Sequence, residues 1–196
     1  MNRNVSRRAF VSRSLRTGAA IAAAGALGVP AVVPSAALGL DGNTAPSDRI
    51  TMGLIGCGSH GRGWNVDRMF ENPAQQIIAV CDVDRQFMHE AQHKVDAFYS
   101  QKAGGGYKAC SAYGDFRDLV NRKDIDAVDI VTPDHWHVLM SVFAMKAGKD
   151  VICEKPTLTI AEGRILSDVQ KATARVYQTA SENRSIDTFQ YMVNVV

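Results

Sequence analysis

The amino-acid sequence predicts an α/β fold in which a parallel β-sheet is covered by helices on both faces. Two observations support this prediction. From Arg49 onwards, short apolar segments typical of strands alternate about six times with segments of helical periodicity. The first apolar segment, residues 50–55, runs directly into a glycine-rich turn with the spacing G-x-G-x-x-G, formed by Gly56, Gly58 and Gly61. A strand that enters such a turn and continues into a helix is typical of a Rossmann-type, doubly wound sheet.

The boundaries of the expected elements follow from apolar runs and from residues that start or stop helices. We expect strands at residues 50–55, 76–81, 108–112, 127–131, 150–153 and 176–179, and helices at residues 63–70, 85–97, 115–121, 135–147, 160–174 and 189–196. Asn72-Pro73 ends the first helix, and Asp84 caps the second. Thr159 and Glu162 form a capping box before the fifth.

Two of these regions carry further expectations. The helix at residues 135–147 is expected to turn Leu139, Val142, Phe143 and Met145 toward the sheet. The three glycines at residues 104–106 read as a flexible turn, because no strand precedes them as it would precede a phosphate-binding loop.

The first 39 residues read as an export signal. They contain the twin-arginine sequence Ser6-Arg7-Arg8-Ala9-Phe10-Val11, an uncharged stretch at residues 18–33, and small residues at 35–37 that suit a cleavage site. A transmembrane anchor is the alternative, but the stretch is short and rich in alanine and glycine. We therefore predict a cleaved signal at residues 1–39, a linker at 40–48, and export by the twin-arginine machinery to a periplasmic or extracellular location.

Composition and charge narrow the classes of function. The chain is 46% hydrophobic, which suits a globular domain with a substantial core. Its formal net charge is +2, but residues 1–39 contain five arginines and no acidic residue, so the remaining chain carries a net charge of −3. That charge gives no indication of binding to nucleic acid or to a membrane surface.

The glycine-rich turn and a downstream carboxylate predict a dinucleotide site. The first glycine permits the tight turn, the second lets a pyrophosphate approach the backbone, and the third lets the helix pack against the strand. Asp82 follows the second expected strand, 21 positions after Gly61. There a Rossmann fold binds the ribose hydroxyls of NAD and repels the 2′-phosphate of NADP. Helix capping is the alternative role for Asp82, but Asp84 fills it better. We therefore predict NAD rather than NADP, carried through export in the folded protein and held tightly.

Three further blocks follow ends of expected strands: Thr132-Pro133-Asp134-His135-Trp136-His137, Glu154-Lys155-Pro156 and Asn183-Arg184. The carboxyl ends of parallel strands meet at one edge of a sheet, where ligands bind. We therefore expect these blocks to join the glycine-rich turn in one site. The two histidines also raise the question of a metal, but no further cluster is spaced to complete a site, so no metal is predicted.

With these blocks in this order, the chain resembles the Gfo/Idh/MocA family, the group of glucose–fructose oxidoreductase and inositol dehydrogenase. The resemblance extends over residues 49–196. It implies that cofactor contacts come from Gly56, Cys57, Gly58, Ser59, His60, Gly61, Asp82, Thr132, Pro133, His135, His137, Glu154, Lys155, Pro156 and Asn183. It also implies that Lys155 is catalytic, because an ammonium group beside a carbinol oxygen stabilises alkoxide charge and can relay its proton. A solvated surface lysine is the alternative.

The resemblance also implies a second domain, an open antiparallel sheet that supplies most of the substrate pocket and the usual oligomer interface. The dinucleotide-binding domain is expected at residues 49–185, and residues 186–196 begin a helix leading toward a C-terminal domain that is absent from this chain. A fragment of a longer enzyme and a self-standing module are both consistent with the sequence, and the apolar run Tyr191-Met192-Val193 favours the fragment. The chain alone is expected to bind cofactor with little turnover, and homo-oligomers are expected only with the second domain.

Three functions remain open. The first is an oxidoreductase that moves hydride between a nicotinamide cofactor and a hydroxyl carbon of a sugar or cyclitol, so that the partner is a small carbohydrate-like molecule. The second is a redox-neutral glycosidase that uses NAD for a transient oxidation. The third is a non-catalytic sensing or assembly module that holds the cofactor as a structural element.

The four cysteines are expected to be free thiols. Cys57, Cys81, Cys110 and Cys153 are even in number, which in an exported protein invites disulfides. Three of them lie in or at the ends of expected strands, where cysteine behaves as a small buried hydrophobe. Folding before export also removes the need for oxidation.

Overall fold

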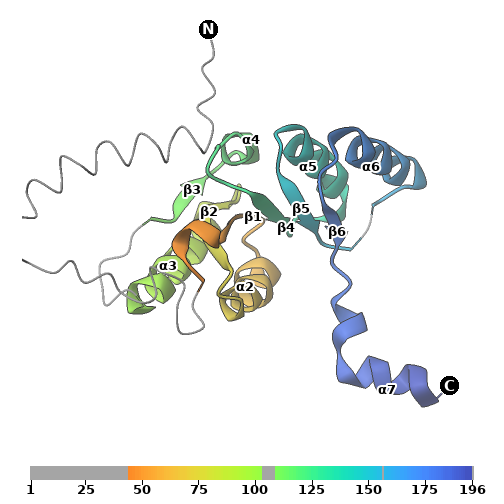
Figure 1. Cartoon of the computed structure of the whole chain (residues 1–196), viewed down its shortest axis with the longest axis horizontal. Coiled ribbons are helices and arrows are strands. Elements are labelled where there is room, and N and C mark those ends of the chain that lie inside the picture. Colours follow the sequence, from red (N-terminus) through yellow and green to blue (C-terminus); the bar gives the residue numbers. More distant parts are fainter. Residues whose placement is uncertain (1–43, 103–108, 156, 196) are drawn as a thin grey trace, which may run out of the picture.

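The computed structural model describes residues 44–102, 109–155 and 157–195. Its core is a six-stranded sheet with helices on both faces (Figure 1). The strand order is β3-β2-β1-β4-β5-β6, and every neighbouring pair is parallel. This is the order of the doubly wound, Rossmann-type fold, so the predicted fold class is confirmed.

The six strands have the following bounds: β1 Ile50–Ile55, β2 Gln75–Cys81, β3 Ser111–Tyr113, β4 Ala127–Ile130, β5 Asp150–Cys153 and β6 Tyr177–Thr179. The α-helices are α2 Val66–Glu71, α3 Arg85–Lys102, α4 Phe116–Val120, α5 Asp134–Lys146, α6 Ile160–Thr173 and α7 Asp187–Val195. A π-helix, η4 His60–Asn65, leads directly into α2, and the short 3₁₀ helices are η3 Pro46–Asp48 and η5 Glu182–Ser185. Among the helices of the described residues, none is both long and apolar enough to cross a membrane.

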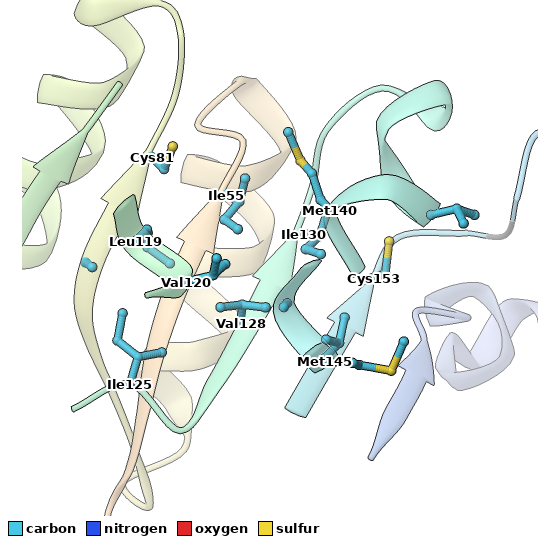
Figure 2. Close-up of a cluster of buried hydrophobic side chains, with 14 of the residues drawn as sticks. Ile55, Cys81, Leu119, Val120, Ile125, Val128, Ile130, Met140, Met145 and Cys153 are labelled. Atoms are coloured by element: carbon cyan, nitrogen blue, oxygen red, sulfur yellow. The ribbon is translucent and has the colours of Figure 1, made fainter. Parts of the chain in front are cut away.

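The helices divide the core into two clusters. On one face, α2 and α3 pack against a cluster that includes Met52, Leu54 and Ile77. On the other face, α4, α5 and α6 cover a second cluster, part of which is drawn in Figure 2. Successive residues of a strand point to opposite faces, so β4 gives Val128 and Ile130 to the second cluster.

The sheet is covered unevenly on the α2 face. There α2 and α3 pack over β2 and β3, and Figure 1 shows both below the same half of the sheet. On the same face, Ile152 of β5 and Gln178 of β6 border a groove of about 340 Å³ that runs along α2. Helix α7 follows η5 and has no buried residue. Helices therefore cover the outer strands β5 and β6 on the face of the sheet that carries α6.

Most predicted boundaries are confirmed within a few residues, and two expectations need correction. Helix α3 continues to Lys102 rather than ending at residue 97. The extra turn is held because Phe98 stacks on Phe70 at 3.7 Å between ring centroids and the Tyr99 hydroxyl accepts a hydrogen bond from the Ile77 N–H at 3.0 Å. The expected glycine turn at residues 104–106 lies outside the described residues.

The predicted inward face of α5 is partly wrong. Leu139 and Phe143 are 45% and 44% exposed, whereas the buried residues are His137, Val138, Met140, Ser141, Ala144 and Met145. Phe143 instead meets Phe116 of α4 edge to face, with ring centroids 5.7 Å apart. Because α5 carries apolar residues around most of its circumference, periodicity alone did not distinguish the stripe that meets the sheet.

The four cysteines are buried free thiols, as predicted. Burial raises the pKa of Cys57 above its ordinary value, raises the pKa of Cys81 and Cys110 to about 12, and raises the pKa of Cys153 to about 11. These thiols are therefore core side chains with little thiolate character.

Candidate functional site

A cleft of about 810 Å³ opens at the carboxyl edge of the sheet. It lies where the strand order reverses between β1 and β4, which is the place where doubly wound sheets bind ligands. Its walls are the loops that follow β1, β2, β3 and β4 together with α5. Eight of the predicted cofactor-binding residues line it: Gly56, Gly58, Ser59, His60, Gly61, Asp82, Thr132 and Pro133.

The glycine loop is shaped by two glycines that no other residue could replace without distortion. Gly56 has a φ angle of 99°, and a Cβ on it would collide with the carbonyl oxygen of Val131 at the end of β4. A Cβ on Gly61 would collide with the carbonyl oxygen of Gly56. At Gly58, by contrast, no atom lies within 4 Å of the Cβ position. The backbone at Gly58 therefore faces open space in the cleft, as the approach of a pyrophosphate requires.

Asp82 fastens the glycine loop to the end of β2. Its Oδ2 accepts a hydrogen bond from the Cys57 N–H at 2.6 Å, and its Oδ1 accepts one from the Asp84 N–H at 2.8 Å. Asp84 in turn accepts from the N–H groups of Gln86 and Phe87, which confirms it as the cap of α3. Asp82 therefore lines the cleft at the end of β2, with its carboxylate oriented by the glycine loop.

Arg62 is a further support of the loop that the sequence did not reveal. Its Nη1 donates to the Cys57 carbonyl oxygen at 3.0 Å, and its Nε pairs with Glu90 of α3 at 3.2 Å. The guanidinium also lies 4.5 Å above the centre of the Phe87 ring. Glu90 and Phe87 lie in α3, about 25–28 positions later in the chain, so no local pattern could have indicated them.

The β3 side of the cleft combines an ion pair with apolar walls. Asp115 caps α4 by accepting from the Arg117 N–H at 2.9 Å, and the Arg117 guanidinium lowers the pKa of this carboxyl to about 2. Apolar walls come from Val83, Phe87, Phe116, Trp136 and Met140. A slot of this kind suits a flat aromatic ring with polar groups at its rim, such as adenine.

His137 joins the two loops that follow β4 and β5. Its ring is 1% exposed, with Nε2 2.7 Å from the Thr132 carbonyl oxygen and Nδ1 3.0 Å from the Lys155 carbonyl oxygen. Both neighbours are acceptors, so both contacts are hydrogen bonds when both ring nitrogens carry protons. The histidine thus fixes the spacing between the Thr132 and Lys155 loops from behind the cleft.

Two observations test whether this cleft fits NAD. The open space at Gly58 accommodates phosphate against bare backbone. The Thr132 hydroxyl oxygen is buried and has no hydrogen-bond partner in the described residues, although the residue lines the cleft. A buried hydroxyl without a partner is costly, and a polar ligand atom in the cleft would satisfy it. The residues present therefore fit a dinucleotide.

Lys155, the predicted catalytic residue, forms an ion pair at the end of β5. Its Nζ lies 2.7 Å from Oδ1 of Asp134, the first residue of α5. Both side chains are largely exposed, at 68% and 46%. The pair raises the pKa of Lys155 and lowers the pKa of Asp134. Asp134 was not among the predicted site residues, although its place between Pro133 and His135 was a signal for it.

A buried polar cluster lies beside the cleft, between η4, β4 and the β5 loop. Asn65 Nδ2 donates to Asp129 Oδ2 at 2.9 Å and lies 3.3 Å from Glu154 Oε1. The same Glu154 oxygen lies 3.3 Å from His60 Nε2 in the glycine loop. Asp129 and Glu154 are only 4% and 9% exposed. The sequence analysis missed Asp129, whose signal was a lone carboxylate inside an apolar strand.

Seven predicted residues are not among those that line the cleft: His137, Glu154 and Lys155, described above, and Cys57, His135, Pro156 and Asn183. His135 and Asn183 are exposed, on α5 and η5. Pro156 lies outside the described residues. Cys57 is buried and contributes through its backbone N–H, as described above. Within the described residues, no group of three or more His, Cys, Asp or Glu side chains is arranged to hold a metal ion.

Comparison with known proteins agrees with this geometry. Residues 50–181 match the sequence profile of the Gfo/Idh/MocA oxidoreductase family, which is described by its NAD-binding Rossmann fold. A similar relative is glycosyl hydrolase family 109 protein 2 from Shewanella sp. (strain ANA-3). It is 35% identical over 175 residues, which cover 86% of this chain and 38% of that protein.

Comparison with solved structures also finds similar proteins. Scyllo-inositol dehydrogenase from Lactobacillus casei, with bound NAD(H) and scyllo-inositol, is 25% identical with a TM-score of 0.63, and the match covers 75% of this chain and 40% of that one. Myo-inositol 2-dehydrogenase from Lactobacillus plantarum shares the fold at 24% identity and a TM-score of 0.61, covering 75% and 40%. The chain thus spans about two fifths of the length of these proteins.

Proposed function

Because this chain belongs to the Gfo/Idh/MocA oxidoreductase family and has its NAD-binding Rossmann fold, we propose that it is the cofactor-binding part of an exported enzyme. The enzyme moves hydride between NAD and a hydroxyl-bearing carbon of a sugar or cyclitol. The observation that carries this proposal is that the Lys155–Asp134 pair follows β5 at the same carboxyl edge of the sheet as the glycine loop and Asp82. Similarity to scyllo-inositol dehydrogenase supports the substrate class.

The proposed chemistry divides between cofactor and protein. Bound NAD supplies the hydride acceptor or donor. The glycine loop and Asp82 would hold its pyrophosphate and adenosine ribose, and the loop after β5, which His137 links to the loop after β4, would present Lys155. Because Asp134 raises the pKa of Lys155, the lysine is an ammonium near neutral pH. It therefore donates a proton to a carbonyl oxygen in reduction, and must first lose that proton to serve as base in oxidation.

A redox-neutral glycosidase is the second candidate. Its support is the similarity to a protein named as a glycosyl hydrolase of family 109, at 35% identity. The same cleft and the same lysine would serve a transient oxidation followed by elimination, because both chemistries begin with hydride removal from a carbinol carbon. The two candidates differ in whether reduced cofactor accumulates.

Cofactor binding is tested on the chain itself. NADH is expected to co-purify and to be released by denaturation, and added NADH should bind with a fluorescence change. Asp82→Asn is the informative variant, because the amide oxygen can still accept the Cys57 N–H while the charge and the bond from the Asp84 N–H are lost. We expect its preference for NAD over NADP to fall by roughly tenfold or more. An unchanged preference would assign the ribose contact to another group.

The reaction is tested on the longest native polypeptide that contains this chain. A steady change in NADH absorbance with a sugar or cyclitol supports the oxidoreductase, whereas release of an aglycone without net NADH supports the glycosidase. Tight binding with neither activity would support a third role, that of a non-catalytic sensing or assembly module.

Export rests on the twin-arginine sequence at residues 6–11. A reporter fused after residue 39 is expected outside the cytoplasm, and replacing Arg7 and Arg8 by lysine should retain it inside. Export that persists in the double variant would contradict the twin-arginine route.

A further inference from the structure

We propose that Asp129 binds a proton in the folded protein and pairs with the Asn65 amide through two hydrogen bonds, and that this pair positions Glu154 beside the cofactor cleft. The link to the cofactor rests on the proposed function, whereas the proton on Asp129 does not. Asp129 lies in the centre of the sheet and touches neither substrate nor cofactor, so it acts through Asn65 as a positioning residue.

The first argument is a pair of oxygens without partners. Asn65 Nδ2 donates to Asp129 Oδ2 at 2.9 Å. The remaining oxygens of the same two side chains, Asn65 Oδ1 and Asp129 Oδ1, are both buried and have no hydrogen-bond partner in the described residues. Both are acceptors when Asp129 is ionised, so neither can satisfy the other. Two buried acceptors without donors on one interacting pair substantially destabilise the folded state.

A single proton removes both penalties. If Oδ1 of Asp129 carries hydrogen, it can donate to Asn65 Oδ1, while Asn65 Nδ2 continues to donate to Asp129 Oδ2. Carboxyl and carboxamide groups are planar forks of matching size, so they can form both bonds at once when the two groups lie in one plane. The product is a neutral ring of two hydrogen bonds.

Burial and the nearby Glu154 carboxylate favour the protonated form of Asp129. Glu154 faces it from the β5 loop and His60 from η4, while Arg68 of α2 borders the same groove but binds Glu71 and lies over the Trp64 ring. The neighbouring strands contribute only uncharged side chains, Leu54 of β1 and Ile152 of β5. Burial raises the pKa of Asp129 to about 6; the Asn65 amide and His60 oppose this rise, and Glu154 adds to it.

The pair reaches the cofactor cleft through Glu154. The Asn65 amide lies 3.3 Å from Glu154 Oε1, which in turn lies 3.3 Å from His60 Nε2, and His60 lines the cleft. A closed ring fixes the plane of the Asn65 amide, so that its second N–H is directed at Glu154. When Asp129 ionises, the ring opens and two carboxylates share one amide group. The position of Glu154 then becomes less defined, next to the glycine loop.

The proton is tested directly by NMR. The chain is labelled with ¹³C at aspartate carboxyls, and the Asp129 signal is identified by its loss in Asp129→Asn. We expect Asp129 to titrate near pH 6, and the side-chain amide signals of Asn65 to follow the same midpoint. A midpoint near the ordinary value of 3.8, or an Asn65 amide that ignores the titration, overturns the pair.

The positioning role is tested by NADH titration at about pH 5 and about pH 7.5, on the wild type, Asp129→Asn and Asp129→Leu. Asp129→Asn retains both hydrogen bonds as an amide pair that cannot ionise, whereas Asp129→Leu retains neither. The ratio of the NADH affinity of the wild type to that of Asp129→Asn should be near one at the lower pH. This ratio should be lower by roughly threefold or more at the higher pH. Asp129→Leu should bind more weakly at both.

The outcomes separate the two proposals. A ratio that does not change with pH overturns the positioning role while leaving cofactor binding intact. No NADH binding by any variant overturns the proposed function, and the NMR titration still decides the protonation of Asp129. If Asp129→Leu does not fold, the comparison of wild type with Asp129→Asn gives the same decision.

Discussion

At the scale of single residues, Gly58 and Gly61 differ in what surrounds them, although both belong to one loop. Gly61→Ala forces its Cβ against the Gly56 carbonyl oxygen, so it should lower the free energy of unfolding by roughly 1–3 kcal/mol. Gly58→Ala meets no atom within 4 Å, so stability should be retained while NADH affinity falls by about tenfold or more. Thermal unfolding and NADH titration measure the two effects separately.

Gly63→Ala is the matched control for this pair. A Cβ there also meets nothing within 4 Å, but Gly63 belongs to η4 and does not line the cleft. Its stability and NADH affinity are both expected to stay near those of the wild type. If Gly58→Ala also bound NADH like the wild type, the pyrophosphate would not lie against the second glycine.

Asp129 should also make stability depend on pH. Its pKa is raised from 3.8 to about 6 in the folded chain, so its contribution is fully present below pH 3.8 and is lost as the pH rises through about 6. Between these limits, the unfolding free energy of the wild type should fall by roughly 3 kcal/mol relative to Asp129→Asn. Urea unfolding of both proteins across this range measures the difference. Parallel curves would show that Asp129 titrates alike in both states.

Local sequence identified some of these residues and missed others for a physical reason. The glycine loop and Asp82 have a fixed spacing, because one turn and one strand determine where each lies. The partners of Asp129 and Lys155 are set by strand order instead. Asn65 and Asp134 lie 64 and 21 positions from them, and only the folded sheet brings each pair together.

At the scale of elements, His137 is the connection between the loops after β4 and β5. Replacing it by phenylalanine keeps a ring of similar size but removes the imidazole contacts with the Thr132 and Lys155 carbonyl oxygens. Loss of a hydrogen bond of this kind costs about 0.5–1.5 kcal/mol, so His137→Phe should be destabilised in urea. It should also weaken NADH binding, because the loop of Thr132 and Pro133 loses its anchor.

Trp136→Phe is a suitable comparison on the same helix turn. Trp136 is 39% exposed and lines the cleft, and within the described residues its indole, unlike the His137 ring, is not hydrogen-bonded to either loop. Its replacement should change NADH affinity with little loss of stability. Equal destabilisation by both variants would argue against His137 as the specific link.

The elements themselves were predictable to different degrees. The bounds of β5 and the capping box of α6 follow from local signals, and both are found as expected. The buried stripe of α5 did not follow, because contacts with Phe116 of α4 and with the two loops determine how that helix is rotated. The local sequence thus predicted whether a segment is a helix or a strand more reliably than which of its faces is buried.

At the scale of the whole molecule, the core should protect all four thiols. They are buried, with raised pKa values, so a thiol reagent such as DTNB should react with the native chain at least about a hundredfold more slowly than with free cysteine. In denaturant, four thiols should react promptly. Fewer than four in denaturant without reductant would indicate a disulfide.

The uneven cover of the sheet has a consequence for its dynamics. The strands β1, β2 and β4 lie inside the sheet, whereas β3 and β6, of three residues each, are its edges. Of these two, β3 packs against α3 and α4, so β6 is the less covered edge. Amide protons of β1 and β2 should therefore exchange with deuterium only through global opening, while those of β6 exchange through local opening. Asp82 follows β2, whose amide protons should exchange slowly. Lys155 follows β5, which lies next to β6, the strand expected to open locally. Under the proposed function, the site is therefore expected to be rigid where Asp82 would hold the adenosine end of NAD and more mobile beside Lys155.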